Sequence, residues 1–251
     1  MIARAARLSS LVAVALTVAC TSYYEIPIET PIRAKLDTGP FQRVLVAGFI
    51  AGGADDVDSN LETTRLLRSQ LRNKSDLRVI DVDVLPLMDV ASDDREAEAS
   101  GDGGLPPVIK DEKDIEAYEH VFANVEYWKK VGEEFQNPLI VTGTLLFVER
   151  TNNQVVQREV EMFDDLGRRR LVPTRNFVER KGFALNGRFI FIDGRTGAQL
   201  HSQSFGEQVM YSTQQTTPAL SSYFELMDRL IPNFLSTLSS TKVKGTRILL
   251  Q

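Results

Sequence analysis

The strongest constraint on the fold is an early alternation of strand and helix patterns. Val44–Ile50 is a short apolar run rich in β-forming residues, as expected of a buried strand. Leucines at helical spacing follow, and Ser59 and Glu62 have the spacing of a capping box at the start of that helix. A second strand is predicted over Leu77–Leu85. Strand, helix and strand within about 40 residues indicate an α/β unit.

The rest of the chain is first helical and then rich in strands. An apolar stripe predicts a long amphipathic helix over residues 115–135, with His120 off the stripe and therefore on the surface. β-rich segments follow, and a last helical stripe covers residues 220–238, which Pro232 should kink. The sequence thus predicts an α/β fold, a mixed sheet packed with amphipathic helices, as a single domain over residues 43–251. The strands predicted in its second half are Leu139–Val148, Val155–Phe163, Arg170–Phe177, Phe183–Phe191 and Ala198–Val209.

One segment departs from this pattern by its acidity. Residues 89–111 combine carboxylates with glycines and prolines. Such a stretch cannot bury enough apolar area to offset the entropy lost on ordering, so a mobile loop is predicted. Its carboxylates lack the fixed spacing of an EF-hand, which disfavours a calcium site.

A second segment, the predicted β-hairpin over residues 155–181, is basic within an acidic chain. Arg168, Arg169 and Arg170 lie at its turn, and Arg175 follows. The functional interpretation is a docking edge for an acidic partner or for anionic envelope polymers. The structural alternative is a set of charges that protects an exposed edge strand from aggregation. The sequence leaves both open.

The first twenty residues have the layout of a bacterial secretory signal. Arg4 and Arg7 precede an apolar run of eleven residues, Leu8–Val18. That run is shorter than the roughly 20 residues of a membrane-spanning helix. Its end, Leu16–Cys20, resembles the lipobox of bacterial lipoproteins, in which the cysteine is lipidated and becomes the new N-terminus. Cys20 is the only cysteine, so no intramolecular disulfide can form.

This resemblance predicts a signal peptide over residues 1–19 and a lipidated tether over residues 20–42. The alternative for the tether is a segment packed along the edge of the domain. More than one acyl chain gives stable membrane anchoring. Thr21 follows the cysteine, instead of the aspartate that retains enterobacterial lipoproteins in the inner membrane. The resemblance therefore implies the outer membrane, with the domain in the periplasm. Cleavage would change the net charge from −5 to −7, which disfavours nucleic-acid binding.

A search for chemistry finds no catalytic constellation. His120 and His201 are not in metal-ligand spacing, and there is no G-x-S-x-G motif. Gly48–Gly53 lies between a strand and a helix but lacks the residues of a phosphate-binding loop. Asp81 and Asp83 alternate with apolar residues, as solvent-side carboxylates of a strand do. The sequence therefore predicts no catalytic residue, no metal and no cofactor.

Several segments together resemble the CsgG, TolB N-terminal domain and LpoB superfamily over about residues 43–238. The resemblance implies a small α/β sandwich on a lipid tether, used for protein contacts in the cell envelope. The leading interpretation is a non-enzymatic outer-membrane lipoprotein that docks an envelope protein, with its oligomeric state open. The alternatives are a ring- or pore-forming secretion subunit, as in CsgG, and a periplasmic hydrolase. The segments are Arg43–Phe49, Val79–Asp81, Pro138–Thr144, and Gly187–Asp193 with Thr196-Gly197.

Overall fold

The structure, a computed structural model, contains two compact units. The larger unit spans Lys35–Ser239, and the smaller unit holds the chain on either side of it. Cys20, the predicted signal peptide and most of the predicted acidic loop lie outside the described residues. The described residues are 23–91, 108–163, 165, 167–212, 215 and 217–250.

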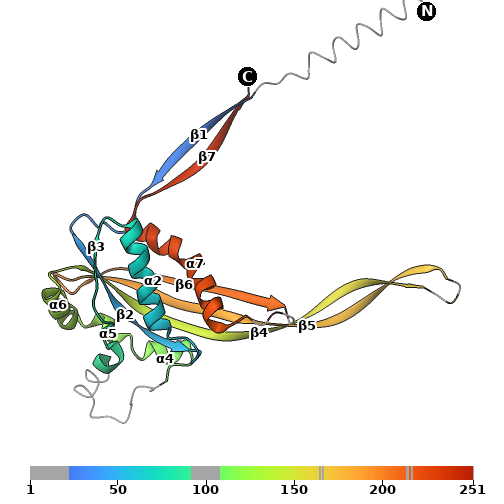
Figure 1. The fold of residues 1–251 in the computed structure, drawn as a ribbon, viewed down its shortest axis with the longest axis horizontal. Helices are drawn as coiled ribbons and strands as arrows, with labels where there is room; N and C mark the ends of the chain where they lie inside the picture. Colours follow the sequence, from blue (N-terminus) through green and yellow to red (C-terminus); the bar gives the residue numbers. More distant parts are fainter. Residues whose placement is uncertain are drawn as a thin grey trace, which may run out of the picture. The chain divides into compact units, whose positions relative to one another are not determined.

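The larger unit is built on a mixed sheet with the strand order β3-β2-β4-β5-β6 (Figure 1). Strand β2 runs parallel to β3 and β4, whereas β4, β5 and β6 are antiparallel to one another. The strands are β2 (Arg43–Gly53), β3 (Arg78–Ile80), β4 (Leu139–Phe163), β5 (Arg169–Asp193) and β6 (Gln199–Ser212).

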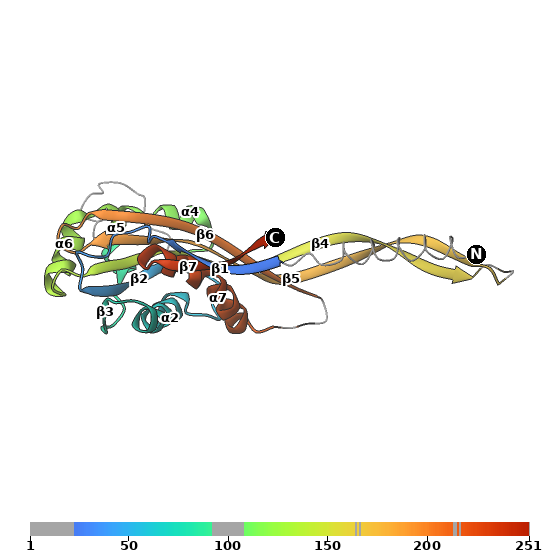
Figure 2. The ribbon, with the colours of Figure 1, turned by 90° about the horizontal axis from the view of Figure 1, so that it is seen from above.

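Helices cover both faces of this sheet (Figure 2). One face carries α2 (Ser59–Lys74) and α7 (Ala219–Leu238). The other carries α4 (Glu112–Glu116), α5 (His120–Ala123) and α6 (Val125–Glu134). The structure confirms the predicted class, a mixed sheet packed with helices. None of the helices among the described residues combines the length and apolarity needed to cross a membrane.

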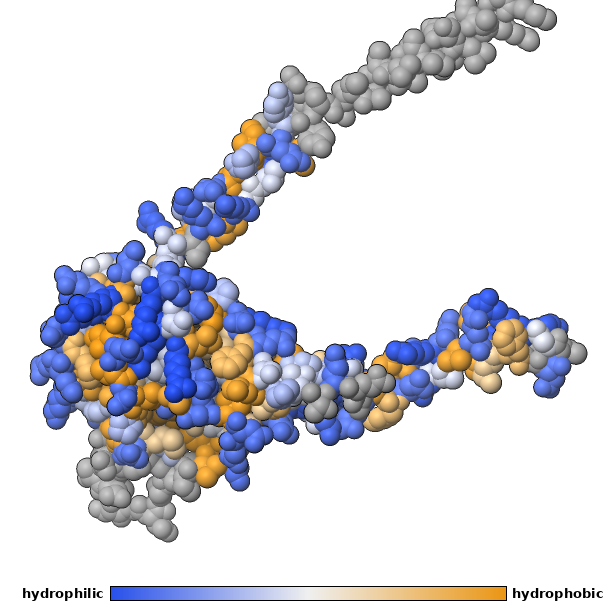
Figure 3. Space-filling model, viewed as in Figure 1, coloured by the Kyte–Doolittle hydropathy of each residue, from blue (hydrophilic) through white to orange (hydrophobic). Residues whose placement is uncertain are grey.

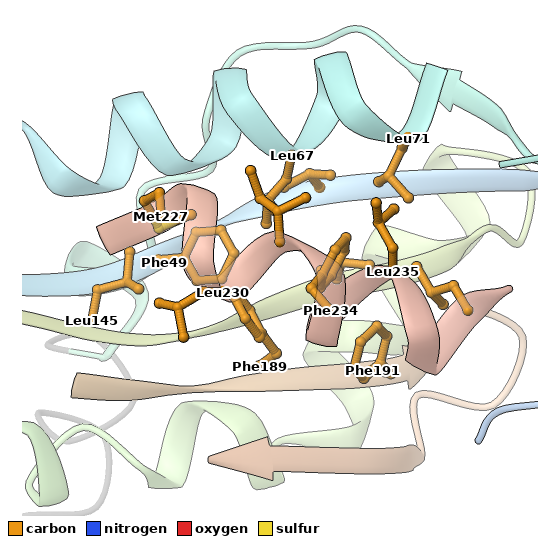
Figure 4. Close-up of a cluster of buried hydrophobic side chains, with 14 of the residues drawn as sticks. Phe49, Leu67, Leu71, Leu145, Phe189, Phe191, Met227, Leu230, Phe234 and Leu235 are labelled. Atoms are coloured by element: carbon orange, nitrogen blue, oxygen red, sulfur yellow. The ribbon is translucent and has the colours of Figure 1, made fainter. Parts of the chain in front are cut away.

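The two faces of the sheet hold two separate hydrophobic clusters. Along the inner part of β4, Val141 and Leu145 face α2 and α7, whereas Ile140 and Leu146 face α4–α6. This alternation follows from the period of two in a strand, and burial on both faces explains the nearly continuous apolar run. Figure 4 shows the cluster under α2 and α7, which includes Phe49, Leu67, Leu71, Phe189, Leu230 and Phe234.

A β-bulge at Gly48 directs the later side chains of β2 toward the right clusters. Val44 and Val46 face α2 and α7, so strict alternation would turn Phe49 to the opposite face. The register with β4 shifts between Val46 and Gly48, where Gly48 adopts a φ of 126°. Only glycine adopts such a conformation without strain. Phe49 thereby joins the cluster under α2 and α7, where it is 1% exposed.

Several elements differ from their predicted bounds. Strands predicted separately over Leu139–Val148 and Val155–Phe163 form one continuous strand of 25 residues, and β5 is equally long. Strands β4 and β5 pair antiparallel without a break. This pairing satisfies the backbone hydrogen-bonding groups of the residues that lie between the two predicted strands. The predicted strand Leu77–Leu85 is regular only over Arg78–Ile80.

The helix predicted over residues 115–135 is broken into α4, α5 and α6. Asn124 has a non-helical ψ of 87°, and its side chain accepts a hydrogen bond from the Tyr127 amide as the N-cap of α6. The surface position predicted for His120 is wrong. Its ring is partly buried, with nitrogens 3.0 Å from the Ala117 carbonyl oxygen and 3.2 Å from that of Ala91.

The start of α2 also differs from the prediction. Its N-cap is Asp58, whose carboxylate accepts a hydrogen bond from the Leu61 amide at 2.9 Å, and Ser59 is the first helical residue. The predicted solvent-side position of Asp81 is observed, because its side chain is 73% exposed and pairs with Arg72 at 2.8 Å.

The smaller unit places a strand where the sequence predicts a tether. Strand β1 (Tyr23–Ile32) pairs antiparallel with β7 (Thr241–Leu250) over its whole length. The interval 20–42 therefore contains one strand of a regular two-stranded ribbon, and the second strand comes from residues 241–250.

We predict that Gly48→Ala lowers the free energy of unfolding by about 2–4 kcal/mol, through backbone strain and crowding. The new Cβ would lie 2.6 Å from Cγ1 of Val84, at a φ that alanine rarely adopts. Urea unfolding followed by circular dichroism measures the change. Gly39→Ala is the control, because its Cβ would meet only Asp37, and we expect an effect within about 0.5 kcal/mol. Equal stability of the two variants would contradict the role of the bulge.

Candidate functional site

The most distinctive surface of the larger unit is a two-stranded projection, which we call the arm. It consists of residues 149–163 of β4 and 169–179 of β5 (Figures 1 and 2). Strand β2 pairs with β4 only as far as Phe147, and β6 reaches β5 only as far as Arg180. Beyond these points the outer edges of both strands have no strand partner among the described residues. No described residue of the arm is fully buried.

The arm exposes large apolar side chains as well as charges. Val155 lies opposite Phe177, and the two side chains are 58% and 73% exposed. Phe163 and Leu171 add further exposed apolar area near the tip, and Figure 3 shows hydrophobic side chains along the projection. A two-stranded hairpin is at best marginally stable in water. The arm is therefore supported from its base, where its strands enter the core.

The predicted basic cluster lies at the end of the arm but is divided between its faces. Arg169 and Arg175 share one face, because side chains alternate along a strand, and Arg170 points to the other. Arg168 precedes the first residue of β5. Arg169 forms an ion pair with Glu161 on the adjacent strand. The four arginines are all exposed, but they form two smaller basic surfaces instead of the single cluster expected.

Aromatic packing and a partly buried hydroxyl fix the base of the arm. Phe147 stacks on Phe183 with ring centroids 5.0 Å apart, which joins β4 to β5 where the arm leaves the core. The Tyr211 hydroxyl lies 2.9 Å from the Glu225 carboxylate and 3.1 Å from the Ser222 hydroxyl, which ties β6 to α7. Burial and the nearby Glu225 carboxylate raise the pKa of Tyr211, so its hydroxyl stays protonated and can donate.

A polar pocket of about 420 Å³ lies between α4 and the sheet. Arg188 forms an ion pair with Glu119, and the Asn186 amide donates to Glu112 at 3.1 Å. These contacts hold two of the glutamates that line the pocket, and Glu116 also lines it. The pocket can admit a small polar molecule, but the ion pair and the hydrogen bond at its wall serve to connect α4 and α5 to β5.

The glycines predicted to precede the helix do not form an anion site. A hollow of about 340 Å³ lies at the N-terminus of α2, and Asp55 and Asp58 line it. The Asn60 side-chain oxygen accepts a hydrogen bond from the Phe49 amide at 2.8 Å. The Asp58 carboxylate and the Asn60 oxygen thus already accept from backbone amides that a phosphate could use, and the carboxylates repel an anion. Within the part of the chain that the structure describes, no group of His, Cys, Asp and Glu side chains could hold a metal ion.

Comparison with known proteins does not assign the chain to a family. None of the family models matches it, and neither does any curated protein. Lipoprotein GNA1162 from Neisseria meningitidis is 12% identical, with a TM-score of 0.33, over 76% of this chain and 96% of that one. A putative neuraminyllactose-binding hemagglutinin homolog from Helicobacter pylori is 10% identical, with a TM-score of 0.36, over 82% of this chain and 87% of the other. With TM-scores below 0.5, neither likeness establishes a shared function.

We predict that the arm can be shortened without loss of stability. None of its residues belongs to either hydrophobic cluster. Replacing residues 153–179 by a short Gly/Asn/Ser loop should therefore change the free energy of unfolding by less than about 1 kcal/mol. Phe147→Ala, at the buried base, should cost about 3–5 kcal/mol. Urea unfolding compares the two variants, and a large loss on shortening would show that the arm is part of the folding core.

Proposed function

We propose that the protein is a non-enzymatic lipoprotein of the outer membrane that docks a protein partner through its arm. Cys20 carries the lipid anchor, and the larger unit lies in the periplasm. The observation that carries the proposal is the arm itself, a continuation of two core strands that presents open edges and exposed apolar side chains.

The chemistry of the arm favours docking over simple protection of an edge. Protective charges on edge strands usually replace apolar residues, whereas Val155, Phe163 and Phe177 remain exposed here. Val155 and Phe177 lie opposite each other, and exposed apolar pairs of this kind are typical of interaction sites. The β4 edge contains no proline between Glu149 and Phe163, so its backbone groups can accept an added strand.

The partner that fits this surface carries an extended, acidic segment with apolar side chains. Its backbone would pair with the β4 edge, and its apolar side chains would cover Val155 and Phe177. Its carboxylates would lie near Arg169 and Arg175, which share one face of the arm. Charge-assisted contacts of this kind give selectivity and fast association more than raw affinity.

A second candidate, a ring- or pore-forming secretion subunit, is favoured by the charges on the two edges. The β4 part of the arm is slightly acidic and the β5 part is basic. An edge-to-edge contact between copies would bring unlike charges together and would be heterologous, as in a ring. The charged residues are Glu149, Arg150, Arg158, Glu159 and Glu161 on β4, and Arg169, Arg170, Arg175 and Glu179 on β5.

A periplasmic hydrolase remains the weakest candidate. The polar pocket beside α4 brings Glu112, Glu116 and Glu119 near Arg188. Hydrolysis needs an acid and a base whose pKa values are separated by their surroundings. Two of these carboxylates instead serve structural contacts, which supports a non-enzymatic role.

We predict that Cys20→Ser abolishes incorporation of labelled palmitate in the bacterial host and leaves the larger unit folded. The serine hydroxyl is not a substrate for the thioether chemistry of lipidation, so the anchor is lost. Labelling and membrane fractionation measure the outcome. Thr21→Ser is the matched control and should label as the parent does. Palmitate incorporation into the Cys20→Ser chain would refute the anchor.

We predict that a photocrosslinking amino acid in place of Phe177 captures a distinct envelope protein in intact cells. The same group in place of Lys130, an exposed residue of α6, is the control and should capture far less. An adduct that contains only this chain would instead support the ring-forming candidate. Equal capture at both positions would contradict docking by the arm. Arg169→Glu with Arg175→Glu should weaken the Phe177 adduct about fivefold or more if the partner is acidic.

A further inference from the structure

The smaller unit is an amphipathic ribbon whose two faces differ sharply. In the β1–β7 pairing, Ile26 lies opposite Arg247 and Ile28 lies opposite Gly245. We call the face that contains these pairs the isoleucine face. Among the side chains that the structure describes on this face, the large apolar ones are all exposed, and they are Tyr24, Ile26, Ile28, Ile32 and Val243.

The opposite face, which we call the charged face, has its own internal ion pairs. Glu29 lies 3.3 Å from the Lys242 ammonium and 3.8 Å from that of Lys244. These exposed pairs contribute little to stability, and they leave this face compatible with water. A two-stranded ribbon alone is marginally stable, so the isoleucine face gains most from a surface that covers it.

The backbone of β1 disfavours an added strand along that edge of the ribbon. Pro27 and Pro31 lie in β1. Proline has no N–H, and within sheets it lies on edges with that position turned away from the partner strand. The open edge of β1 therefore lacks two donors that an incoming strand would need. A cover on this side of the ribbon therefore contacts the isoleucine face, whereas the β7 edge contains no proline.

The position of the ribbon in the chain indicates which surface covers its isoleucine face. Tyr23 follows Cys20 by three residues. An extended chain covers at most about 3.6 Å per residue, so β1 begins within about 11 Å of the Cys20 α-carbon. The polar headgroup layers of a bilayer are about 5–8 Å thick on each side. If Cys20 is acylated, as the proposed function holds, the first pairs of the ribbon lie in or beside the headgroups.

The charge and composition of the ribbon agree with a lipid surface. Residues 23–34 and 240–250 contain two acidic and four basic residues, whereas the whole chain has a net charge of −5. Arg247 lies on the isoleucine face, where its guanidinium can reach phosphate while its stem stays with the apolar residues. Aliphatic side chains beside tyrosine and arginine are typical of segments that lie at the membrane interface.

We propose that the β1–β7 ribbon lies on the bilayer surface with its isoleucine face against anionic phospholipid. The inference rests on the proposed anchor for its location. The contact itself requires no acyl chain. It makes the segment between the anchor and the larger unit a second membrane contact.

The test uses residues 20–251 with Cys20→Ser, so that no lipid is attached. We expect this chain to float with vesicles of phosphatidylethanolamine and phosphatidylglycerol, and much less with phosphatidylcholine alone. Ile26→Thr with Ile28→Thr should reduce the partition coefficient roughly fivefold or more, since less apolar area enters the interface. Threonine keeps a high strand preference, so the ribbon should persist. Ile248→Thr, a single substitution of the same kind on the charged face, should alter binding less than about twofold, and Ile28→Thr alone is its matched single variant on the isoleucine face.

A second readout reports which face meets the lipid. Cys20 is the only cysteine, so the Cys20→Ser chain accepts a single label. An environment-sensitive fluorophore on Ile28→Cys should shift to the blue on adding vesicles, and one on Thr246→Cys should not. Absence of vesicle binding, or equal responses from both faces, would overturn the inference. So would a change of molecular mass in the isoleucine-face variant without lipid, since this would assign the face to a second copy. None of these outcomes depends on palmitate labelling or arm crosslinking, which test the proposed function separately.

Discussion

The continuous antiparallel pairing of β4 and β5 is the interaction on which the larger unit depends. The inner part of each strand lies between two helical layers and contributes to both hydrophobic clusters. The outer part leaves the core without a break in register, from Glu149 opposite Phe183 to Phe163 opposite Arg169. Because the backbone hydrogen bonds of the arm continue those of the core, the arm is held in direction by the same pairing that stabilises the domain. Its side chains are exposed to solvent to a large extent, as contacts with a partner require.

The arm and the β1–β7 ribbon each have one edge with proline and one edge without. The β4 edge of the arm has no proline over 149–163, whereas β1 has Pro27 and Pro31. An edge with all its donors can accept another strand, but one that lacks two donors cannot. The β4 edge of the arm therefore suits strand addition and the β1 edge of the ribbon does not, whereas Pro173 lies in β5 and β7 contains no proline. Both are amphipathic strand pairs, and in each the edge with proline is the less suited to strand addition.

The sequence predicted the elements whose patterns are local and missed those that depend on distant partners. Strand β2 and the last helix follow from short apolar periodicities, and the sheet class follows from their order. The polar stretch Glu149–Gln154 resembles a loop when taken alone, and only pairing with β5 makes it a strand. Strand β1 could not be predicted for the same reason, since its partner lies more than 200 residues away. The arginines of the arm were found by composition, but their division between two faces required the register.

The ribbon and the arm belong to different units, so their two contacts can act separately. Each unit has its own strand pairing, so the loss of one contact surface need not change the stability of the other. A lipid anchor confines the chain near one surface and thereby raises the effective concentration of any envelope partner. A second, weaker contact through the isoleucine face would restrict the position of the chain further, without a change in the affinity of the arm for its partner. A docking surface of modest intrinsic strength is then sufficient, which is consistent with an arm of mixed apolar and charged residues.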